Sequence, residues 1–285
     1  MKGVYLICLM GLLLSCDIFD KEEDIPGFVY IDSANLSTKA GQGANSSNIV
    51  DITAYANNEF LGTFELPATI PVLSTGDVDF AFAPGIKNNG MVSDRRMYPF
   101  YEFHRKTITV IPDAVVPVES DSIITFTYYD EGLQFNIEDF EGTGYDLIET
   151  ASNNAILAQI TSPPEDVKNG YTLKVSLSPE QDHFEVRSDW GLSNLPKGNK
   201  MYLEIDFKGT VPLEIGIITV SPVVKQIFAL GLVPQSEFTK VYVDLTEKIS
   251  REVATTHFEI YFEANLPVGS TSAELFIDNV KFIYP

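Results

Sequence analysis

Apolar and polar residues alternate with a period of two along most of this 285-residue chain. Clear examples are Ile49 to Tyr55, Phe60 to Leu66 and Thr239 to Leu245. This period places successive side chains on opposite faces of an extended strand, and no long segment has the spacing of an amphipathic helix. Because 45% of the residues are hydrophobic, the strands can bury a sizeable core. The sequence therefore predicts an all-β protein.

The length of the chain suits two β-domains preceded by a targeting segment. The turn-rich segment Asp130-Glu131-Gly132 marks the boundary between them. We expect one small β-sandwich over residues 27–132 and a second sandwich over residues 133–285. Within the first, Asn57-Asn58 predicts a hairpin turn between two strands, since Asn tolerates the positive φ that tight turns need.

The first sixteen residues, MKGVYLICLMGLLLSC, are organised like a bacterial signal peptide. The apolar stretch from Val4 to Leu14 is shorter than the ~20 residues that span a bilayer. The last four residues, Leu13-Leu14-Ser15-Cys16, resemble the lipobox of bacterial lipoproteins. The resemblance implies removal of residues 1–15, a diacylglycerol on the Cys16 sulfur and acylation of its amine, typically with palmitate. The alternative is an ordinary signal peptide in which Cys16 has no such role.

An acidic run follows the cysteine and ends with Lys21, Glu22, Glu23 and Asp24. This run resembles the lipoprotein export signal of Bacteroidota, which places lipoproteins on the outer face of the outer membrane. The resemblance implies a lipid-anchored protein that faces the cell exterior. The alternative is that residues 16–26 are only a solvated tether between the anchor and the first domain.

Residues 48–90 resemble the PEGA-type Ig-like module. The residues that carry the resemblance include Leu66-Pro67-Ala68 and Pro84-Gly85-Ile86-Lys87. Together with Tyr98-Pro99-Phe100-Tyr101, they also resemble a lipoprotein family of Bacteroidota, some members of which accompany the outer-membrane barrel-assembly machinery. The resemblance implies an outer-membrane barrel protein or complex as the partner.

The segment from Asn88 to Tyr101 is the least strand-like part of the first half. It combines Arg95 and Arg96 with Tyr98, Phe100 and Tyr101, and arginine and aromatic residues are enriched where proteins bind one another. We expect a partner-binding loop here. The alternative is a packed loop in which the arginines stack on neighbouring rings.

Residues 133–285 resemble the jelly-roll, galactose-binding-like fold of carbohydrate-binding modules. The resemblance lies in the opening Phe140-Glu141-Gly142 and the closing Ile277-Asp278-Asn279-Val280. Many modules of this kind hold a structural Ca²⁺, and the resemblance implies Glu141 and Asp278 as its ligands. Carboxylate oxygens are the ligands that Ca²⁺ prefers. The alternative is that both are ordinary solvated carboxylates.

The single tryptophan, Trp190, lies between polar residues in Arg187-Ser188-Asp189-Trp190-Gly191. Sugar sites in such modules often use an exposed aromatic platform, so Trp190 is a candidate glycan-binding residue. The alternative is a tryptophan that is partly buried in the core.

The composition argues against several other functions. A formal charge of −21 disfavours binding to nucleic acid, because it repels the phosphate backbone. His104, His183 and His257 are scattered, no Gly-x-Ser-x-Gly elbow is present, and no cysteine is free to act as a nucleophile. Counting alone does not exclude a carboxylate pair, but without a motif the sequence indicates a binding protein rather than an enzyme.

Two functions agree with these observations. The first is a non-catalytic accessory subunit of an outer-membrane protein complex, with barrel assembly as the first candidate. The second is a glycan-binding surface lipoprotein of a nutrient-uptake system. No cofactor is expected apart from the candidate calcium ion.

Overall fold

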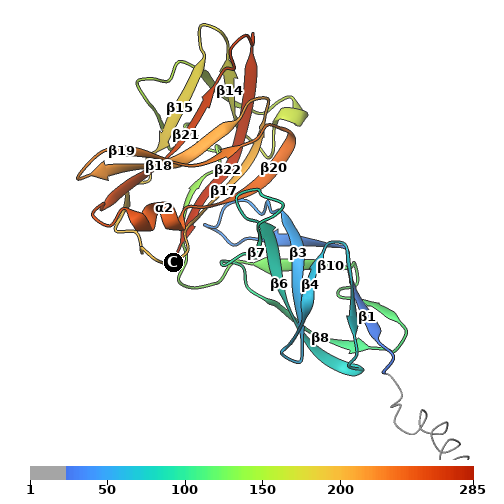
Figure 1. The fold of residues 1–285 in the computed structure, drawn as a ribbon. Helices are drawn as coiled ribbons and strands as arrows, with labels where there is room; N and C mark the ends of the chain where they lie inside the picture. The colour runs from blue at the N-terminus through green and yellow to red at the C-terminus, as the bar shows by residue number, and fades with distance from the viewer. Residues whose placement is uncertain (1–23) are drawn as a thin grey trace, which may run out of the picture.

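The computed structural model describes residues 24–285, and strands make up most of it (Figure 1). The prediction of an all-β protein is therefore confirmed. Cys16 and three residues of the acidic run, Lys21, Glu22 and Glu23, lie outside the described residues, whereas Asp24 is described and exposed. No helix within residues 24–285 is long and apolar enough to cross a membrane.

The described strands before residue 132 form a compact β-structure. They are β1 (Gly27–Ile31), β2 (Ser33–Ser37), β3 (Ile49–Ala56), β4 (Glu59–Glu65), β5 (Ala68–Val72), β6 (Gly76–Lys87), β7 (Arg95–Met97), β8 (His104–Val110), β9 (Val115–Pro117) and β10 (Ile123–Thr127). The largest sheet has the order β4-β3-β6-β7, and β8 also pairs with β6. The smaller sheets are β5-β1-β9 and β10-β2. Ile52, Phe82 and Phe126 are fully buried in their shared apolar cluster.

The hairpin between β3 and β4 shows how local sequence sets the fold. Asn57 and Asn58 connect the strands with φ values of 50° and 66°. Asparagine visits this left-handed region more readily than most other residues with a side chain. The hairpin predicted at Asn57-Asn58 is therefore confirmed.

The strands after residue 132 form a two-sheet sandwich. They are β11 (Gln134–Glu138), β12 (Leu147–Glu149), β13 (Ile156–Ile160), β14 (Thr172–Leu177), β15 (His183–Ser188), β16 (Leu192–Ser193), β17 (Tyr202–Gly209), β18 (Leu213–Ser221), β19 (Lys225–Leu232), β20 (Gln235–Asp244), β21 (His257–Asn265) and β22 (Ala273–Tyr284). A 3-10 turn, η1 (Pro164–Asp166), and a short helix, α2 (Thr246–Arg251), lie between strands.

One sheet has the order β13-β14-β22-β17-β20, with β11 paired to β22, and we name it the inner sheet. The other has the order β12-β15-β21-β18-β19, with β16 paired to β21, and we name it the outer sheet. Alternation builds the core between them. In β17, Leu203, Ile205 and Phe207 point into the sandwich and have no exposed surface.

The residues that alternate with these in β17 point to the other side of the inner sheet, yet they are also buried; they are Tyr202, Glu204 and Asp206. A solvated outer face would leave them exposed. They are buried because the first half of the chain covers this face, and β22 brings the C-terminus to the same junction (Figure 1).

Candidate functional site

The two halves of the chain share one apolar core at this junction. Tyr202, Tyr242 and Ile283 come from the inner sheet and pack in the same buried cluster as the aromatic residues Tyr98 and Tyr101 of the first half. Tyr98 stacks edge-on against Tyr202, with ring centroids 5.3 Å apart, and lies 4.8 Å from Tyr242. The inner sheet therefore uses both of its faces to bury apolar surface.

The junction corrects one of our expectations. Tyr98, Phe100 and Tyr101 are at most 3% exposed, so the expectation of an exposed aromatic loop that binds another protein is wrong for these three residues. Their residue types do reflect an interface, but the interface lies within this chain.

Glu204 is the polar centre of the junction. Tyr98 and Tyr128 donate hydrogen bonds from their hydroxyls to its Oε1 at 2.7 and 2.8 Å. Lys240 lies 3.5 Å from its Oε2. Burial, and then the charge of Glu204, raise the pKa of Tyr98 and of Tyr128 well above the ordinary tyrosine value, so both phenols stay protonated and act as donors.

A bulge in β22 arranges the second group of buried charges. The register between β17 and β22 shifts between Glu204 and Asp206, and Asn279 adopts a φ of 48° at this point. Asn279 donates from Nδ2 to Asp206 Oδ2 at 2.9 Å, and Lys240 donates to the Asn279 carbonyl at 3.3 Å.

Lys281 links this network to the first half of the chain. Its ammonium donates to the Ala44 carbonyl and, at 3.4 Å, to the Tyr128 hydroxyl. Burial lowers the pKa of Lys281 to about 8. Most of these groups pair with one another across the two halves, so the network is suited to holding the halves in one orientation.

Arg95 and Arg96 lie at the edge of the junction, and both pair with carboxylates of this chain. Arg95 contacts Asp51 at 2.6 Å and Glu65 at 3.1 Å, and Arg96 contacts Asp94 at 2.7 Å. Their guanidinium groups are therefore largely engaged already.

Glu141 and Asp278 face the same loop, residues 168–172. Asp278 accepts hydrogen bonds from the Thr172 hydroxyl at 2.9 Å and from the Asn169 amide at 3.4 Å, and Glu141 accepts one from the Tyr171 amide at 2.8 Å. Within residues 24–285 no group of three carboxylate, histidine or cysteine side chains is suited to hold a metal. The loop thus directs N–H and O–H donors at the two carboxylates. A calcium ion would need further oxygen ligands at these positions, so the arrangement does not fit a calcium ion.

Trp190 is half-buried and packs against the core of the sandwich. Its indole N–H is buried and has no hydrogen-bond partner. This placement agrees with the alternative of a tryptophan that is partly buried in the core.

The face of the outer sheet that points away from the core of the sandwich carries a row of polar and aromatic side chains. Cross-strand pairing places Arg187 opposite Tyr261, Tyr261 opposite Gly216, and Gly216 opposite Phe228. A Cβ at Gly216 would overlap the Tyr261 ring and the Ile227 carbonyl. Because glycine has no side chain, Tyr261 can lie against the sheet, next to the half-exposed Phe228.

Polar groups on neighbouring strands hold this face in order. Arg187 donates to Glu259 at 2.8 Å, and Gln226 donates to Glu263 at 3.1 Å. A pocket of about 370 Å³ opens beside them. Its lining residues are Glu149, Thr150, Ala151, Glu185, Arg187, Ile218, Val224 and Gln226. We name Glu185, Arg187, Ile218, Gln226 and Phe228 the sheet-face site.

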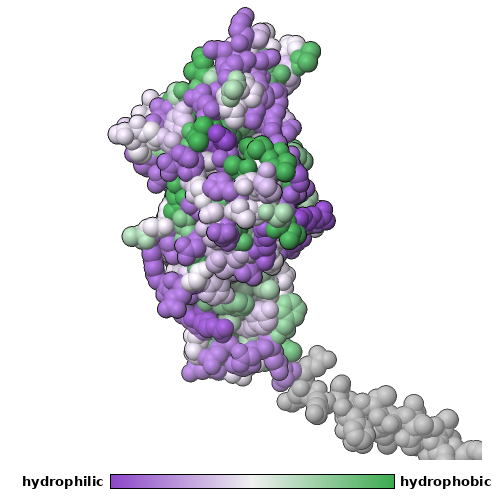
Figure 2. All heavy atoms as spheres, turned by 90° about the vertical axis from the view of Figure 1, so that its left-hand side faces the viewer, coloured by the Kyte–Doolittle hydropathy of each residue, from purple (hydrophilic) through white to green (hydrophobic). Residues whose placement is uncertain are grey.

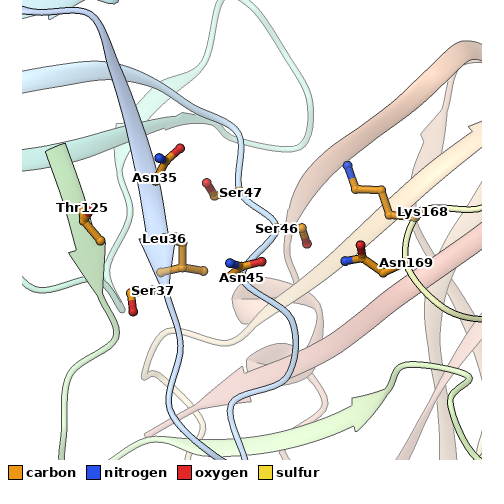
Figure 3. A pocket seen from close by; sticks show the side chains of 9 residues that line it. All are labelled: Asn35, Leu36, Ser37, Asn45, Ser46, Ser47, Thr125, Lys168 and Asn169. Atoms are coloured by element: carbon orange, nitrogen blue, oxygen red, sulfur yellow. The ribbon is translucent and has the colours of Figure 1, made fainter. Parts of the chain in front are cut away.

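A second pocket, of about 620 Å³, lies between the two halves of the chain (Figure 3). Asn45 and Ser46 of the first half face Lys168 and Asn169 of the second across it. Amides and hydroxyls dominate its lining, and it offers no aromatic side chain. It is a polar, open trough with little apolar surface to hold a ligand.

Sequence reasoning did not find the sheet-face site. Its residues come from β15, β18 and β19 and meet only through long-range pairing, so no local motif contains them. One signal was present: Gly216 interrupts an otherwise apolar strand, and a glycine inside a strand often marks a close approach.

No protein-family model and no curated protein matches this sequence. Solved structures with a similar fold include two structures of mutants of a family 29 carbohydrate-binding module. The first, complexed with mannohexaose, is 10% identical with a TM-score of 0.38 and covers 54% of this chain and 93% of that one. The second, complexed with cellulohexaose, is 11% identical with a TM-score of 0.36 and covers 53% and 91%.

The enzymatically active domain of tailspike protein 4 from bacteriophage CBA120 is also similar, at 14% identity and a TM-score of 0.37. It covers 50% of this chain and 20% of that one. These distant likenesses concern the β-fold of about half of the chain.

Proposed function

We propose that this protein is a non-catalytic, lipid-anchored glycan-binding protein of the outer-membrane surface, and that it binds glycan at the sheet-face site. The observation that carries the proposal is the combination found there. The guanidinium of Arg187, the amide of Gln226 and the carboxylate of Glu185 line the pocket, and the half-exposed ring of Phe228 lies two residues from Gln226 on β19. The predicted acylation of Cys16 and the acidic run from Lys21 to Asp24 support the location.

The chemistry of this face suits a sugar ring. A sugar presents neighbouring hydroxyls, which planar groups such as guanidinium, amide and carboxylate can bind in pairs. It also presents a C–H face, which packs on Phe228 and Ile218. The pocket volume of about 370 Å³ falls within the range of small-molecule sites.

The accessory role in a barrel-assembly complex has no described contact surface at the loop where we expected one. The side chains of Tyr98, Phe100 and Tyr101 are enclosed in the junction. Glycan binding was the second function expected from the sequence, and the exposed sheet-face site makes it the better supported of the two.

The test is glycan binding by the folded protein, first on a glycan array and then by titration calorimetry. We expect Arg187→Ala to weaken binding at least about tenfold, since a hydrogen bond to a charged group contributes about 1.5–3 kcal/mol. Gln226→Ala removes a neutral hydrogen bond, worth about 0.5–1.5 kcal/mol, and should weaken binding by about two- to tenfold. Phe228→Ala should weaken binding further by removing the ring against which the sugar packs.

Asn169→Ala, in the pocket between the two halves, is the matched control and should bind like the parent. Loss of binding by this variant alone would move the site to the junction pocket. If the parent protein binds no glycan on the array, the proposed function is wrong.

A further inference from the structure

One end of the first half of the chain exposes four aliphatic side chains. Ile25 is 60% exposed, Leu73 63%, Ile111 54% and Val115 60%. We name these four residues the tether-end patch. Such side chains are usually at least partly covered in a folded domain, and a group of them marks a contact surface.

Strand pairing brings the patch together from three separate segments. β1 pairs with β5 so that Gly27 lies opposite Val72, the residue before Leu73. On its other edge β1 pairs with β9, with Phe28 opposite Val115. These segments therefore meet at the same end of the domain.

The loop after β8 closes the patch. The Asp113 amide donates to the Pro26 carbonyl at 3.0 Å, so the loop that begins with Ile111 lies against the residue that follows Ile25. The close approach of Gly27 to the Ile111 carbonyl confirms that the two segments touch.

The charges at this end all have one sign. Residues 24–27, 72–77 and 110–115 contain Asp24, Asp77 and Asp113 and no lysine or arginine. Each of these three carboxylates is exposed. The patch is thus apolar with an acidic surround, which disfavours an anionic surface.

The chain also enters the domain at this end. Asp24 directly precedes the patch, and Cys16 lies eight residues earlier, a reach of at most ~29 Å. Figure 1 shows the chain joining the first half beside β1, at the end remote from the second half. In Figure 2, hydrophobic atoms are visible on the first half close to where the chain enters it.

We infer that the tether-end patch is a membrane-contact surface that inserts its aliphatic side chains into the lipid bilayer beside the anchor. This inference rests on the lipid anchor that is part of the proposed function. The occupant is a bilayer with zwitterionic headgroups, because the short tether keeps this end near the membrane and the acidic surround repels anionic lipid. Apolar faces that bind in this way reach about 5–10 Å into the headgroup and acyl boundary.

The experiment uses the full lipidated protein in phosphatidylcholine vesicles whose acyl chains carry bromine as a quencher. Cys8 is removed with the signal peptide and Cys16 carries the lipid, so an introduced cysteine can be labelled alone with an environment-sensitive fluorophore. Ile111→Cys reports on the patch. Val268→Cys, fully exposed in the loop between β21 and β22, is the matched control in the second half.

We expect the label at residue 111 to lose emission and shift to the blue in brominated vesicles, while the label at residue 268 does neither. Introducing Leu73→Asp should abolish the loss at residue 111. Replacing part of the phosphatidylcholine by phosphatidylglycerol should reduce it.

Equal emission at the two positions would overturn the inference, as would a loss at residue 111 that appears only when another protein is added. The mass of the mature protein separates these outcomes from failure of the anchor. An unacylated Cys16 would refute the lipid-anchor part of the proposed function itself, whereas an acylated protein without quenching would refute only the membrane contact.

Discussion

At the scale of single residues, the junction depends on the carboxylate of Glu204. This carboxylate would be exposed to water if its face of β17 were solvated. Glu204 has no exposed surface, and it satisfies two tyrosine hydroxyls and a lysine at once. Buried charges of this kind specify one arrangement of the groups around them more than they add to stability. Removing one partner leaves the other charge buried alone, which is the costly outcome.

We therefore expect Glu204→Ala to lower the free energy of unfolding by about 3–5 kcal/mol, because Lys240 would keep only the more distant Asp206 carboxylate, at 3.9 Å, and the buried Tyr98 and Tyr128 hydroxyls would lose their acceptor. Urea denaturation followed by tyrosine fluorescence measures this. Glu247→Ala is the matched control: its pair with Arg251 is about 70% exposed, and we expect a loss below about 0.5 kcal/mol. Equal losses in the two variants would mean that the junction does not depend on the Glu204 charge.

Asp278 gives a pH-dependent prediction. Burial raises its pKa to about 7, above an unfolded-state value near ~3.9. The folded state therefore holds the proton more tightly, and the stability that Asp278 contributes is complete below about pH 4 and is lost as the pH rises through 7.

Asp278→Asn does not titrate, so raising the pH from 4.5 to 7.5 should destabilise the parent relative to the variant by about 2–4 kcal/mol. Chemical denaturation of both proteins at the two pH values tests this. A difference in stability between the two proteins that is the same at both values would show that Asp278 keeps an ordinary pKa in the folded protein.

At the scale of strands, the absence of a side chain at Gly216 allows Tyr261 to lie against the outer sheet. Gly216→Ala would place a methyl group against the Ile227 carbonyl and the Tyr261 ring, and neither the neighbouring backbone nor a ring packed on the sheet can move freely. We expect a loss of about 1–3 kcal/mol and weaker glycan binding. Gly144→Ala, which meets no atom within 4 Å, should be neutral. Thermal unfolding of both variants provides the comparison.

The alternation in the sequence predicts individual strands, but it does not predict which strands contact one another. Alternation predicts Ile49 to Tyr55 as a strand, and β3 spans Ile49–Ala56. Alternation could not show that both faces of β17 are buried. Tyr202, Glu204 and Asp206 have the appearance of a solvated face, and only the packing of the first half against them reveals their burial.

The same limit applies to the site. Residues 95–101 are unusual in composition, but composition does not distinguish an interface between molecules from one within a chain. The residues of the sheet-face site are contributed by three strands, and their proximity depends on the register between them. Local spacing contains no information on that register.

At the scale of the whole molecule, the shared core makes the two halves one cooperative unit. Exposing the junction would place Tyr202, Tyr242 and Ile283 in water together with several buried charges. We expect a single calorimetric transition for the parent, with the calorimetric and van't Hoff enthalpies equal. In Glu204→Ala combined with Tyr242→Ala the transition should split into two. Two transitions in the parent would contradict a shared core.

The shared core also has a mechanical consequence. If a polymer held on the outer sheet is pulled sideways, a flexible joint between the halves would bend and absorb the displacement. A molecule joined by Glu204 and its tyrosine partners instead transmits the force through both halves without bending, so that, with the proposed lipid anchor, the load reaches the anchor undamped. The anchor and the grip on the polymer are then loaded in series, and the weaker of the two sets the force that the whole attachment can bear.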